Sequence, residues 1–379
     1  NFRGSPRVAL PAGETQMAEV NKELIEEAIK GYIEPHLEKD LVTTKCVKGV
    51  DIDGDKVSVT LELGFPAAGY MDTLVAAVRE RVEAVDGVAS AQITATSKVV
   101  AHSVQKSLKP IDNVKNIIAV ASGKGGVGKS TTAVNLALAL AAEGARVGLL
   151  DADIYGPSQP RMLGISGQPE SADGKTLEPM NNYGIQAMSI GFLVDEETPM
   201  IWRGPMVTQA LEQLLNDTNW DSLDYLVIDL PPGTGDTQLT LAQKVPVSGA
   251  VIVTTPQDIA LLDARKGFKM FEKVEVPVLG IVENMSIHIC SSCGHEEHIF
   301  GQGGGARMAQ QYGVDFLGAL PLDIRIREET DGGKPTVVAE PEARISEIYR
   351  EIARKTAAKL ALQAKSYAAK FPSIVIQNN

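Results

Sequence analysis

Nine consecutive residues carry the clearest chemical signal in the sequence: Gly123, Lys124, Gly125, Gly126, Val127, Gly128, Lys129, Ser130 and Thr131. They fit the pattern G-x-x-x-x-G-K-[ST], whose glycines let consecutive backbone N–H groups converge on phosphate oxygens. Lys129 would reach the β- and γ-phosphates, and the Ser130 hydroxyl would bind Mg²⁺. An apolar run precedes the pattern and a helical pattern follows it, as a phosphate-binding loop requires. The sequence therefore predicts a nucleotide site, against the alternative of a flexible glycine-rich turn.

A second lysine, Lys124, lies inside the same loop. An ordinary phosphate loop has no need of it, because Lys129 already supplies the charge; the extra cation indicates a second nucleotide, that of a second subunit. The pattern G-K-G-G-x-G-K-[ST]-T resembles the deviant Walker A ATPases, which include the nitrogenase iron protein and the septum- and plasmid-partition ATPases. In that class the extra lysine crosses a dimer interface to the partner's phosphates. The resemblance therefore implies a homodimer.

Carboxylates follow two predicted strands. Asp151 and Asp153 come directly after the strand that ends at Leu150, and a carboxylate there can position an attacking water as general base. The class resemblance favours Asp153 for this role, with Asp151 supporting it; the alternative is a cap on the next helix. Asp229 ends the run 225–228, a Walker B pattern whose carboxylate binds Mg²⁺. The following Pro-Pro-Gly-Thr-Gly segment suits a switch loop that senses the γ-phosphate.

Two positions are candidates for recognising the adenine base. Asn284 ends the predicted strand 278–282, and its side-chain amide could pair with the base edge. Residues 321–323, Pro-Leu-Asp, form the other candidate loop. Both positions resemble adenine contacts in this ATPase class, and a structural turn is the alternative for each.

A second chemical cluster occupies 288–298, where two of the three cysteines and three of the five histidines gather. Its C-x-x-C pair, Cys290 and Cys293, places two thiolates on one face of a metal or cluster. Four interpretations remain open: a zinc knuckle completed by histidines, a redox dithiol, inert cysteines in a turn, and half of a site completed by a second subunit. The last is preferred, because Lys124 also indicates a dimer and a symmetric pair supplies the four ligands of a [4Fe–4S] cluster.

Taken together, these motifs resemble the Mrp/ApbC-type iron–sulfur cluster carrier ATPases over about 116–359. The resemblance implies a homodimeric ATPase that uses ATP and Mg²⁺, holds a bridging [4Fe–4S] cluster, and delivers it to apoproteins. It also implies exchange with cluster scaffold proteins. His295 and His298 are outside the family's required set, and their role stays open.

The elements that position these residues alternate along the second part of the chain. Short apolar runs at 146–150, 185–189, 225–228, 250–254, 278–282 and 316–319 are separated by helical patterns. This predicts an α/β P-loop NTPase fold with a mostly parallel sheet covered by helices on both faces. The ligand is then expected at the carboxyl ends of the strands.

A small α+β domain is predicted ahead of this sheet. Apolar residues at helical spacing before Gly31 indicate a first helix, and the strict alternation of 57–63 after an Asp-Gly-Asp turn indicates a hairpin strand. The order α-β-β-α-β resembles the MIP18-like domain. The cysteine usual in that family's loop after the hairpin is absent from 64–70, and Cys46 is interpreted as buried filler. A docking or client-recognition role is therefore preferred to metal binding. The predicted parts are an extension at 1–16, this domain at 17–102, a linker at 103–115, the ATPase at 116–364 and a tail at 365–379.

Composition excludes several classes of function. The formal net charge of −12 argues against a nucleic-acid partner. No apolar run is long enough to span a bilayer and no signal peptide is visible, so no membrane association is expected. Three cysteines do not form a disulfide framework, which favours the cytoplasm.

Two other functions compete with the cluster carrier. A spatial regulator of the septum or plasmid-partition type would need an amphipathic C-terminal helix, and 343–371 has irregular apolar spacing more typical of packing against the ATPase. An electron-transfer reductase like the nitrogenase iron protein places its cluster cysteines far apart in sequence. Here both lie in one C-x-x-C, which favours a labile carrier.

Overall fold

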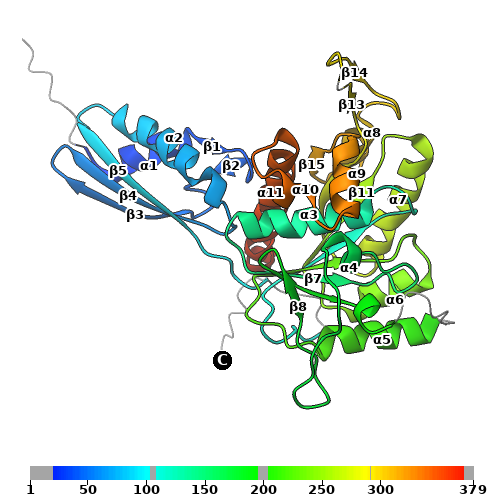
Figure 1. Ribbon diagram of the computed structural model, residues 1–379. Helices are drawn as coiled ribbons and strands as arrows, with labels where there is room; N and C mark the ends of the chain where they lie inside the picture. Colours follow the sequence, from blue (N-terminus) through cyan, green and yellow to red (C-terminus); the bar gives the residue numbers. More distant parts are fainter. Residues whose placement is uncertain (1–19, 103–107, 195–203, 291, 371–379) are drawn as a thin grey trace, which may run out of the picture. The chain divides into compact units, whose positions relative to one another are not determined.

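The computed structural model describes residues 20–102, 108–194, 204–290 and 292–370, which form two compact units (Figure 1). The first unit contains 20–34, 39–62 and 72–96; the second contains 35–38, 63–71 and the described residues from 97 onward. The predicted extension at 1–16 lies outside the described residues, as do 103–107 of the predicted linker and 371–379 of the predicted tail.

The first unit has the predicted α-β-β-α-β order. Its elements are α1 (Lys22–Lys30), β3 (Val47–Asp53), β4 (Lys56–Leu63), α2 (Met71–Glu83) and β5 (Ser90–Ser97), with the sheet order β3-β4-β5. Alternate residues of β4 are buried, which confirms the period-two prediction for this strand. The hairpin turns at Gly54, whose φ of +63° favours glycine. A short pair, β1 (Ile33–Glu34) with β2 (Lys39–Asp40), and a 3₁₀ turn η1 (Ala68–Tyr70) were not predicted.

The second unit is built on an eight-stranded sheet in the order β15-β12-β11-β6-β10-β7-β9-β8. Its strands are β6 (Ile117–Ala121), β7 (Val147–Asp151), β8 (Met180–Asn182), β9 (Ile185–Ser189), β10 (Tyr225–Asp229), β11 (Gly249–Thr254), β12 (Val278–Glu283) and β15 (Phe316–Ala319). All neighbours pair in parallel except β8, which is antiparallel to β9. Every residue of β6, β7, β10 and β11 is buried, as in a sheet covered on both faces. The predicted fold class is thereby confirmed.

Helices cover this sheet in two groups (Figure 1). In one group α3 contacts α4, α10 and α11, and in the other α5, α6, α7 and α8 contact one another in sequence order. The bounds are α3 (Lys129–Ala142), α4 (Gln159–Met162), α5 (Gly204–Asn216), α6 (Asp236–Lys244), α7 (Asp258–Lys273), α8 (Gly304–Tyr312), α9 (Ile324–Asp331), α10 (Thr336–Ala339) and α11 (Arg344–Lys370), with a 3₁₀ turn η2 (Ile190–Phe192). A two-stranded hairpin, β13 (His288–Ile289) with β14 (Glu296–Glu297), projects from the body of the unit.

The C-terminal helix α11 packs into the second unit. Ile345, Ile352 and Leu360 are at most 4% exposed, and the helix contacts α3, β12 and β15. This confirms the prediction that the segment covers the ATPase body. Among the described residues, no helix has the length and apolar character needed to cross a bilayer.

Topology brings the predicted chemistry to one edge of the sheet. Strand β10 lies between β6 and β7 in the sheet. Strand β6 leads into the glycine-rich loop, β7 ends at Asp151 and β10 ends at Asp229, so these three sites are neighbours. Parallel strands end at the same edge, and Asp151 pairs directly with Asp229 in the register of β7 and β10.

Candidate functional site

The glycine-rich loop is shaped by close backbone contacts. A side chain at Gly123 would lie 2.1 Å from the backbone carbon of Asp263 in α7, so only glycine fits there. Gly128 has a φ of +78° and precedes α3 without a side-chain cap. The first backbone N–H groups of α3 are therefore not satisfied by a capping side chain, the arrangement that binds phosphate at helix N-termini.

A cavity of about 310 Å³ lies over this loop. It is lined by Ser122, Lys124, Gly125, Gly126, Gly128, Lys129, Ser130, Thr131, Asp153, Gly156, Ser158, Met162 and Pro232. Most of the predicted nucleotide residues therefore share one cavity. Val127, within the loop, and Asp229, at the end of β10, are buried and do not line the cavity.

The ammonium of Lys129 forms an ion pair with Asp229 and lies 3.2 Å from the Ser130 hydroxyl. Lys129 is 6% exposed and Asp229 is 0% exposed, so both charges depend on this pairing. The phosphate-binding lysine, the Mg²⁺ hydroxyl and the Walker B carboxylate are thus brought together as the motifs predict. Their roles toward a nucleotide stay predictions.

Asp151 anchors the segment that follows β7. Its carboxylate accepts backbone N–H groups of Asp153 at 3.1 Å, Ser158 at 2.9 Å and Gln159 at 3.0 Å. Burial, and then the charge of Asp229, raise the pKa of Asp151 to about 7, although these hydrogen bonds and Lys129 oppose the shift. The carboxylate therefore fixes this segment from inside the protein, which suits the supporting role predicted for it.

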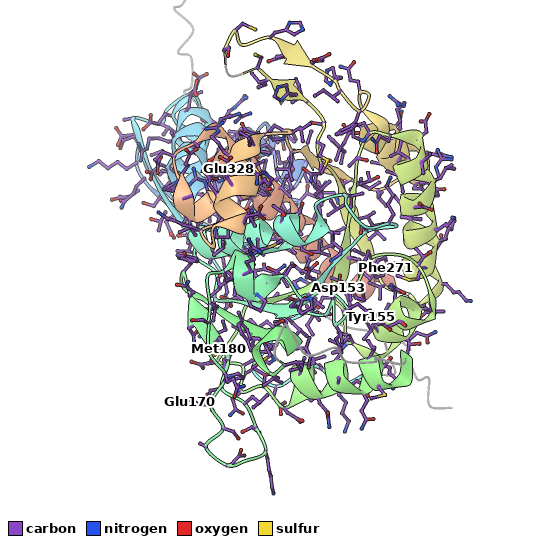
Figure 2. All side chains as sticks on the ribbon, turned by 45° about the vertical axis from the view of Figure 1, so that its right-hand side comes forward. Asp153, Tyr155, Glu170, Met180, Phe271 and Glu328 are labelled. Atoms are coloured by element: carbon purple, nitrogen blue, oxygen red, sulfur yellow. The ribbon has the colours of Figure 1, made fainter. Side chains whose placement is uncertain are left out.

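Asp153 is half-buried and lines the cavity, on the same segment as the exposed Tyr155 (Figure 2). The pKa of Asp153 is raised, mainly by burial. The positive charge of Lys129 lowers this pKa, and the negative charge of Asp229 raises it by a smaller amount. Its side chain is not the cap of α4, whose flanking residue Ser158 makes no capping bond. A carboxylate with an upward-shifted pKa beside the phosphate loop suits a group that accepts a proton from water.

Asn284 braces the loop in this structure. Its amide nitrogen donates to the Val127 carbonyl at 2.9 Å, and its oxygen accepts the Met285 N–H at 2.9 Å. It does not line the cavity. In the other candidate base loop, Asp323 caps α9 by accepting the Arg325 N–H. Both positions have the structural roles given as alternatives, and their contacts with adenine stay predictions.

The cysteine pair lies at the tip of the β13–β14 hairpin, where Ser291 is outside the described residues. The Cys290 N–H donates to the His295 carbonyl at 2.9 Å, and the Gly294 N–H donates to the Cys290 carbonyl at 2.8 Å. The backbone N–H groups of Ser292 and Cys293 lower the pKa of the Cys290 thiol, with smaller contributions from the Cys293 thiol and His288. Cys290 is half-buried and Cys293 is exposed, so the turn favours the thiolate of Cys290 and is open to solvent.

Histidines flank this pair without joining it in a complete metal site. His288 contacts the Leu322 carbonyl at 3.1 Å and His298 contacts the Ser286 carbonyl at 2.8 Å, both through Nδ1. Within the described ranges, no group of three or more His, Cys, Asp or Glu side chains is arranged to hold a metal ion. The pair thus presents two thiols in one chain, and its role as cluster ligand stays a prediction.

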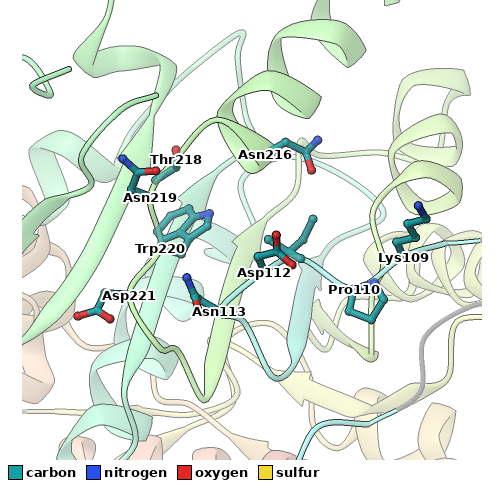
Figure 3. A pocket seen from close by; sticks show the side chains of 10 residues that line it. Lys109, Pro110, Asp112, Asn113, Asn216, Thr218, Asn219, Trp220 and Asp221 are labelled. Carbon is teal, nitrogen blue, oxygen red and sulfur yellow. The ribbon is translucent and has the colours of Figure 1, made fainter. Parts of the chain in front are cut away.

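A second cavity, of about 690 Å³, lies at the opposite edge of the sheet. It is lined by residues 109–113, which lead into β6, and by Asn216 and residues 218–221, which lead into β10. Figure 3 shows side chains of both segments around it. It contains no glycine-rich loop and lies away from the phosphate-binding edge.

Sequence reasoning missed Gln159, the first residue of α4. Its amide donates to Asp229 Oδ2 at 2.9 Å and to the Ser130 carbonyl at 3.1 Å. Nothing in the pattern of one sequence marks a glutamine eight residues after a strand as part of the site.

Both units match known protein families. Residues 113–357 match the family model described as NUBPL iron-transfer P-loop NTPase, and residues 22–94 match the model described as iron–sulfur cluster assembly protein. An iron–sulfur cluster carrier protein of Escherichia coli is 50% identical over 348 residues, covering 92% of this chain and 94% of the relative. One from Pseudomonas fragi is 62% identical over 270 residues, covering 71% and 94%. The mouse iron–sulfur cluster transfer protein NUBPL is 55% identical over 254 residues, covering 66% and 80%.

A solved structure of a nucleotide-binding protein is similar to the second unit. The nucleotide-binding protein of Archaeoglobus fulgidus, in complex with ADP, is 40% identical and superposes with a TM-score of 0.54, covering 61% of this chain and 90% of that one. These matches confirm the resemblance inferred from the motifs, including the MIP18-like character of the first domain. The chain belongs to the family of NUBPL-type iron-transfer P-loop NTPases, carrying an N-terminal iron–sulfur cluster assembly domain.

Proposed function

We propose that this protein is an ATP-hydrolysing iron–sulfur cluster carrier that holds a [4Fe–4S] cluster between two copies of the chain and transfers it to apoproteins. The observation that carries the proposal is the presence, in one unit, of a phosphate loop with its Lys129–Asp229 pair and of a cysteine pair in which the pKa of Cys290 is lowered and Cys293 is exposed. Relatives named as iron–sulfur cluster carriers match over most of the chain.

The residues around the loop fit Mg-ATP. The Oγ of Ser158 and the Oε1 of Gln159 are buried without hydrogen-bond partners in the described structure. Ser158 lines the cavity, and the amide nitrogen of Gln159 donates to Asp229, whose carboxylate would bind Mg²⁺. Lys129 would turn from Asp229 to the phosphates, and Asp153 would orient the water and accept its proton. Bound Mg²⁺ would neutralise charge on the phosphate oxygens.

Two features support a homodimer. No hydrogen bond or ion pair of the Lys124 ammonium is found in the described part of the chain, although the residue lines the phosphate cavity. Helix α7 exposes the apolar side chains of Ile259 and Leu262, which are 70% and 54% accessible. They lie beside the loop, because the next residue, Asp263, packs its backbone against Gly123. An apolar patch next to an available cation is a surface that a second copy can cover.

The cluster is cargo on the exposed hairpin. Two thiolates from each of two copies complete the four ligands of a [4Fe–4S] cluster. Exposure of Cys293 allows a client's thiolate to reach the iron. We propose apo iron–sulfur proteins and cluster scaffold proteins as partners, the first domain as their docking module, and the cytoplasm as the compartment. We retain domain boundaries at 16, 102, 115 and 364 as part of this proposal.

A spatial regulator of the partition type was the rival. It would need a C-terminal amphipathic helix that is free to bind a membrane, but α11 is packed against α3, β12 and β15 within the second unit.

Anaerobic reconstitution with iron and sulfide tests the proposal. The wild-type chain is expected to gain visible absorption and to activate an apo-enzyme that needs a [4Fe–4S] cluster. Cys290→Ala and Cys293→Ala should abolish both readouts. The matched control Cys46→Ala should not, because Cys46 is a buried residue of the first unit, where its thiol accepts the Thr44 hydroxyl. Zinc retained in place of iron, with no transfer, would contradict the carrier function.

A further inference from the structure

Gln159 joins three elements of the phosphate-binding edge. It is 1% exposed, and its amide nitrogen bonds both Asp229 at the end of β10 and the carbonyl of Ser130 in the first turn of α3. Its backbone N–H bonds the Asp151 carboxylate at the end of β7. A buried side chain that ties three separate elements together is positioned to transmit movement among them.

The other half of the same amide has no partner. The Oε1 atom of Gln159 is buried, and no hydrogen bond reaches it in the described structure; the Oγ of Ser158, which lines the cavity, is in the same condition. Buried polar atoms without partners are uncommon, and each calls for an explanation. Here the two atoms belong to consecutive residues: the amide that carries Oε1 is bonded through its nitrogen to Asp229 and to the Ser130 backbone carbonyl, and Ser158 lines the phosphate cavity. Mg²⁺ usually keeps several water molecules when few protein ligands bind it. The Gln159 Oε1 atom and the Ser158 hydroxyl are suited to form hydrogen bonds with such waters.

The Asp229 carboxylate is held from two sides. The Lys129 ammonium donates to Oδ1, and the Gln159 amide donates to Oδ2. When Lys129 turns to a phosphate, Gln159 remains as the group that fixes the orientation of the carboxylate. Gln159 also directly follows the segment 153–158, which is tied to Asp151 through the N–H groups of Asp153 and Ser158. Any adjustment of Asp229 toward a metal therefore acts on the segment that carries Asp153.

We propose that Gln159 is a positioning residue that orients Asp229 toward the nucleotide-bound metal ion and couples occupation of that metal subsite to the segment 153–158. The inference rests on the proposed nucleotide chemistry of this site and adds to it a residue with a stated function. It acts through Asp229 and its own backbone, without contact with the phosphates.

Gln159→Met tests the orienting role, because methionine keeps the unbranched shape and loses the donor and acceptor. The thermal midpoint of the purified protein is measured with ADP alone and with ADP during a titration of Mg²⁺. Gln159→Met should keep the shift due to ADP, since the loop and Lys129 remain, but need about tenfold more Mg²⁺ for half of the additional shift. Tenfold corresponds to about 1.4 kcal/mol, which is near the lower end of the range for one hydrogen bond to a charged group. Gln159→Asn, which retains an amide that is one methylene too short, should behave in the same way.

Hydrogen exchange tests the coupling role without any turnover. In the wild-type protein, Mg²⁺ added to the ADP complex should slow exchange in the peptide that covers 153–158. This protection should be lost in Gln159→Met and kept in the matched control Arg161→Ala, which alters an exposed side chain of the same helix that bonds the Asp331 carbonyl.

The outcomes separate the inference from the function on which it rests. If the wild-type protein shows no thermal response to ADP with Mg²⁺, the nucleotide function fails and the inference fails with it. If the wild-type protein responds, but both Gln159 variants keep the wild-type Mg²⁺ midpoint and the wild-type protection of 153–158, the inference alone is overturned.

Discussion

Replacement of Lys129 by methionine should destabilise the second unit as well as remove nucleotide binding. The lysine is 6% exposed and its partner Asp229 is 0% exposed, with the buried carboxylate of Asp151 nearby. Methionine fills the space of the lysine stem but leaves Asp229 without its cation. Breaking a buried pair by removing one partner costs about 3–5 kcal/mol. Because Gln159 still donates to Asp229, we expect the lower end, about 3 kcal/mol.

The double variant Lys129→Met/Asp229→Asn separates the structural effect from the functional one. With both charges removed, no unpaired ion stays buried, and replacing a whole buried pair is often nearly neutral. We therefore expect the double variant to lie within about 1 kcal/mol of the wild-type protein. Nucleotide binding should be absent from both variants, because neither keeps Lys129, the cation that the loop directs at the β- and γ-phosphates of its own nucleotide.

Urea unfolding followed by tryptophan fluorescence measures this cycle. The chain has two tryptophans, Trp202 and Trp220, and both belong to the sequence of the second unit, so the signal reports that unit alone. Nucleotide binding is measured on the same samples with a fluorescent ADP analogue. A single variant as stable as the wild-type protein, or a double variant no more stable than the single one, would refute the assignment of a buried, mutually dependent pair.

Three further predictions concern the same unit. Asp153→Ala should lower the rate of ATP hydrolysis by about 10²–10⁴-fold, the usual contribution of a general base, while ADP binding stays within a few-fold; wild-type turnover would exclude Asp153 as the water-positioning group. Arg354→Ala should cost about 3–5 kcal/mol in urea unfolding, because it leaves the fully buried Glu143 without its 2.7 Å partner, whereas the exposed Arg325→Ala should cost less than about 1 kcal/mol. Because the pKa of Asp151 is raised from 3.8 to about 7, the folded state binds the additional proton, and stability should decline as the pH rises from about 4 to about 7; Asp151→Asn should flatten this part of the profile, and a profile unchanged by the substitution would contradict the raised pKa.

The framework of the site could be predicted because it depends on local patterns. The apolar runs before Asp151 and Asp229 become fully buried strands, and the glycine pattern before Lys129 becomes the cradle at the start of α3. Parallel topology then brings these strand ends to one edge without further information from the sequence. The alternation of β4 in the first unit was readable for the same reason.

The contacts that support this framework could not be predicted, because they depend on tertiary packing. Gln159 reaches Asp229 only because α4 begins over the ends of β7 and β10. Glu143, at the end of α3, meets Arg354 of α11 across more than two hundred residues of sequence. Asn284 was predicted from its place after a strand, but its observed bond to the Val127 carbonyl follows from how closely Gly128 lets the chains approach. Single-sequence patterns carry no signal for such pairings.

Two copies of the chain are proposed to share one cluster through Cys290 and Cys293. Native mass spectrometry of the anaerobically reconstituted protein measures this directly. We predict a dimer that carries the mass of one [4Fe–4S] unit, and a mixed dimer of wild-type chain with a Cys290→Ala/Cys293→Ala chain that does not retain it. A cluster retained on a monomer, or equally well by the mixed dimer, would contradict the shared site.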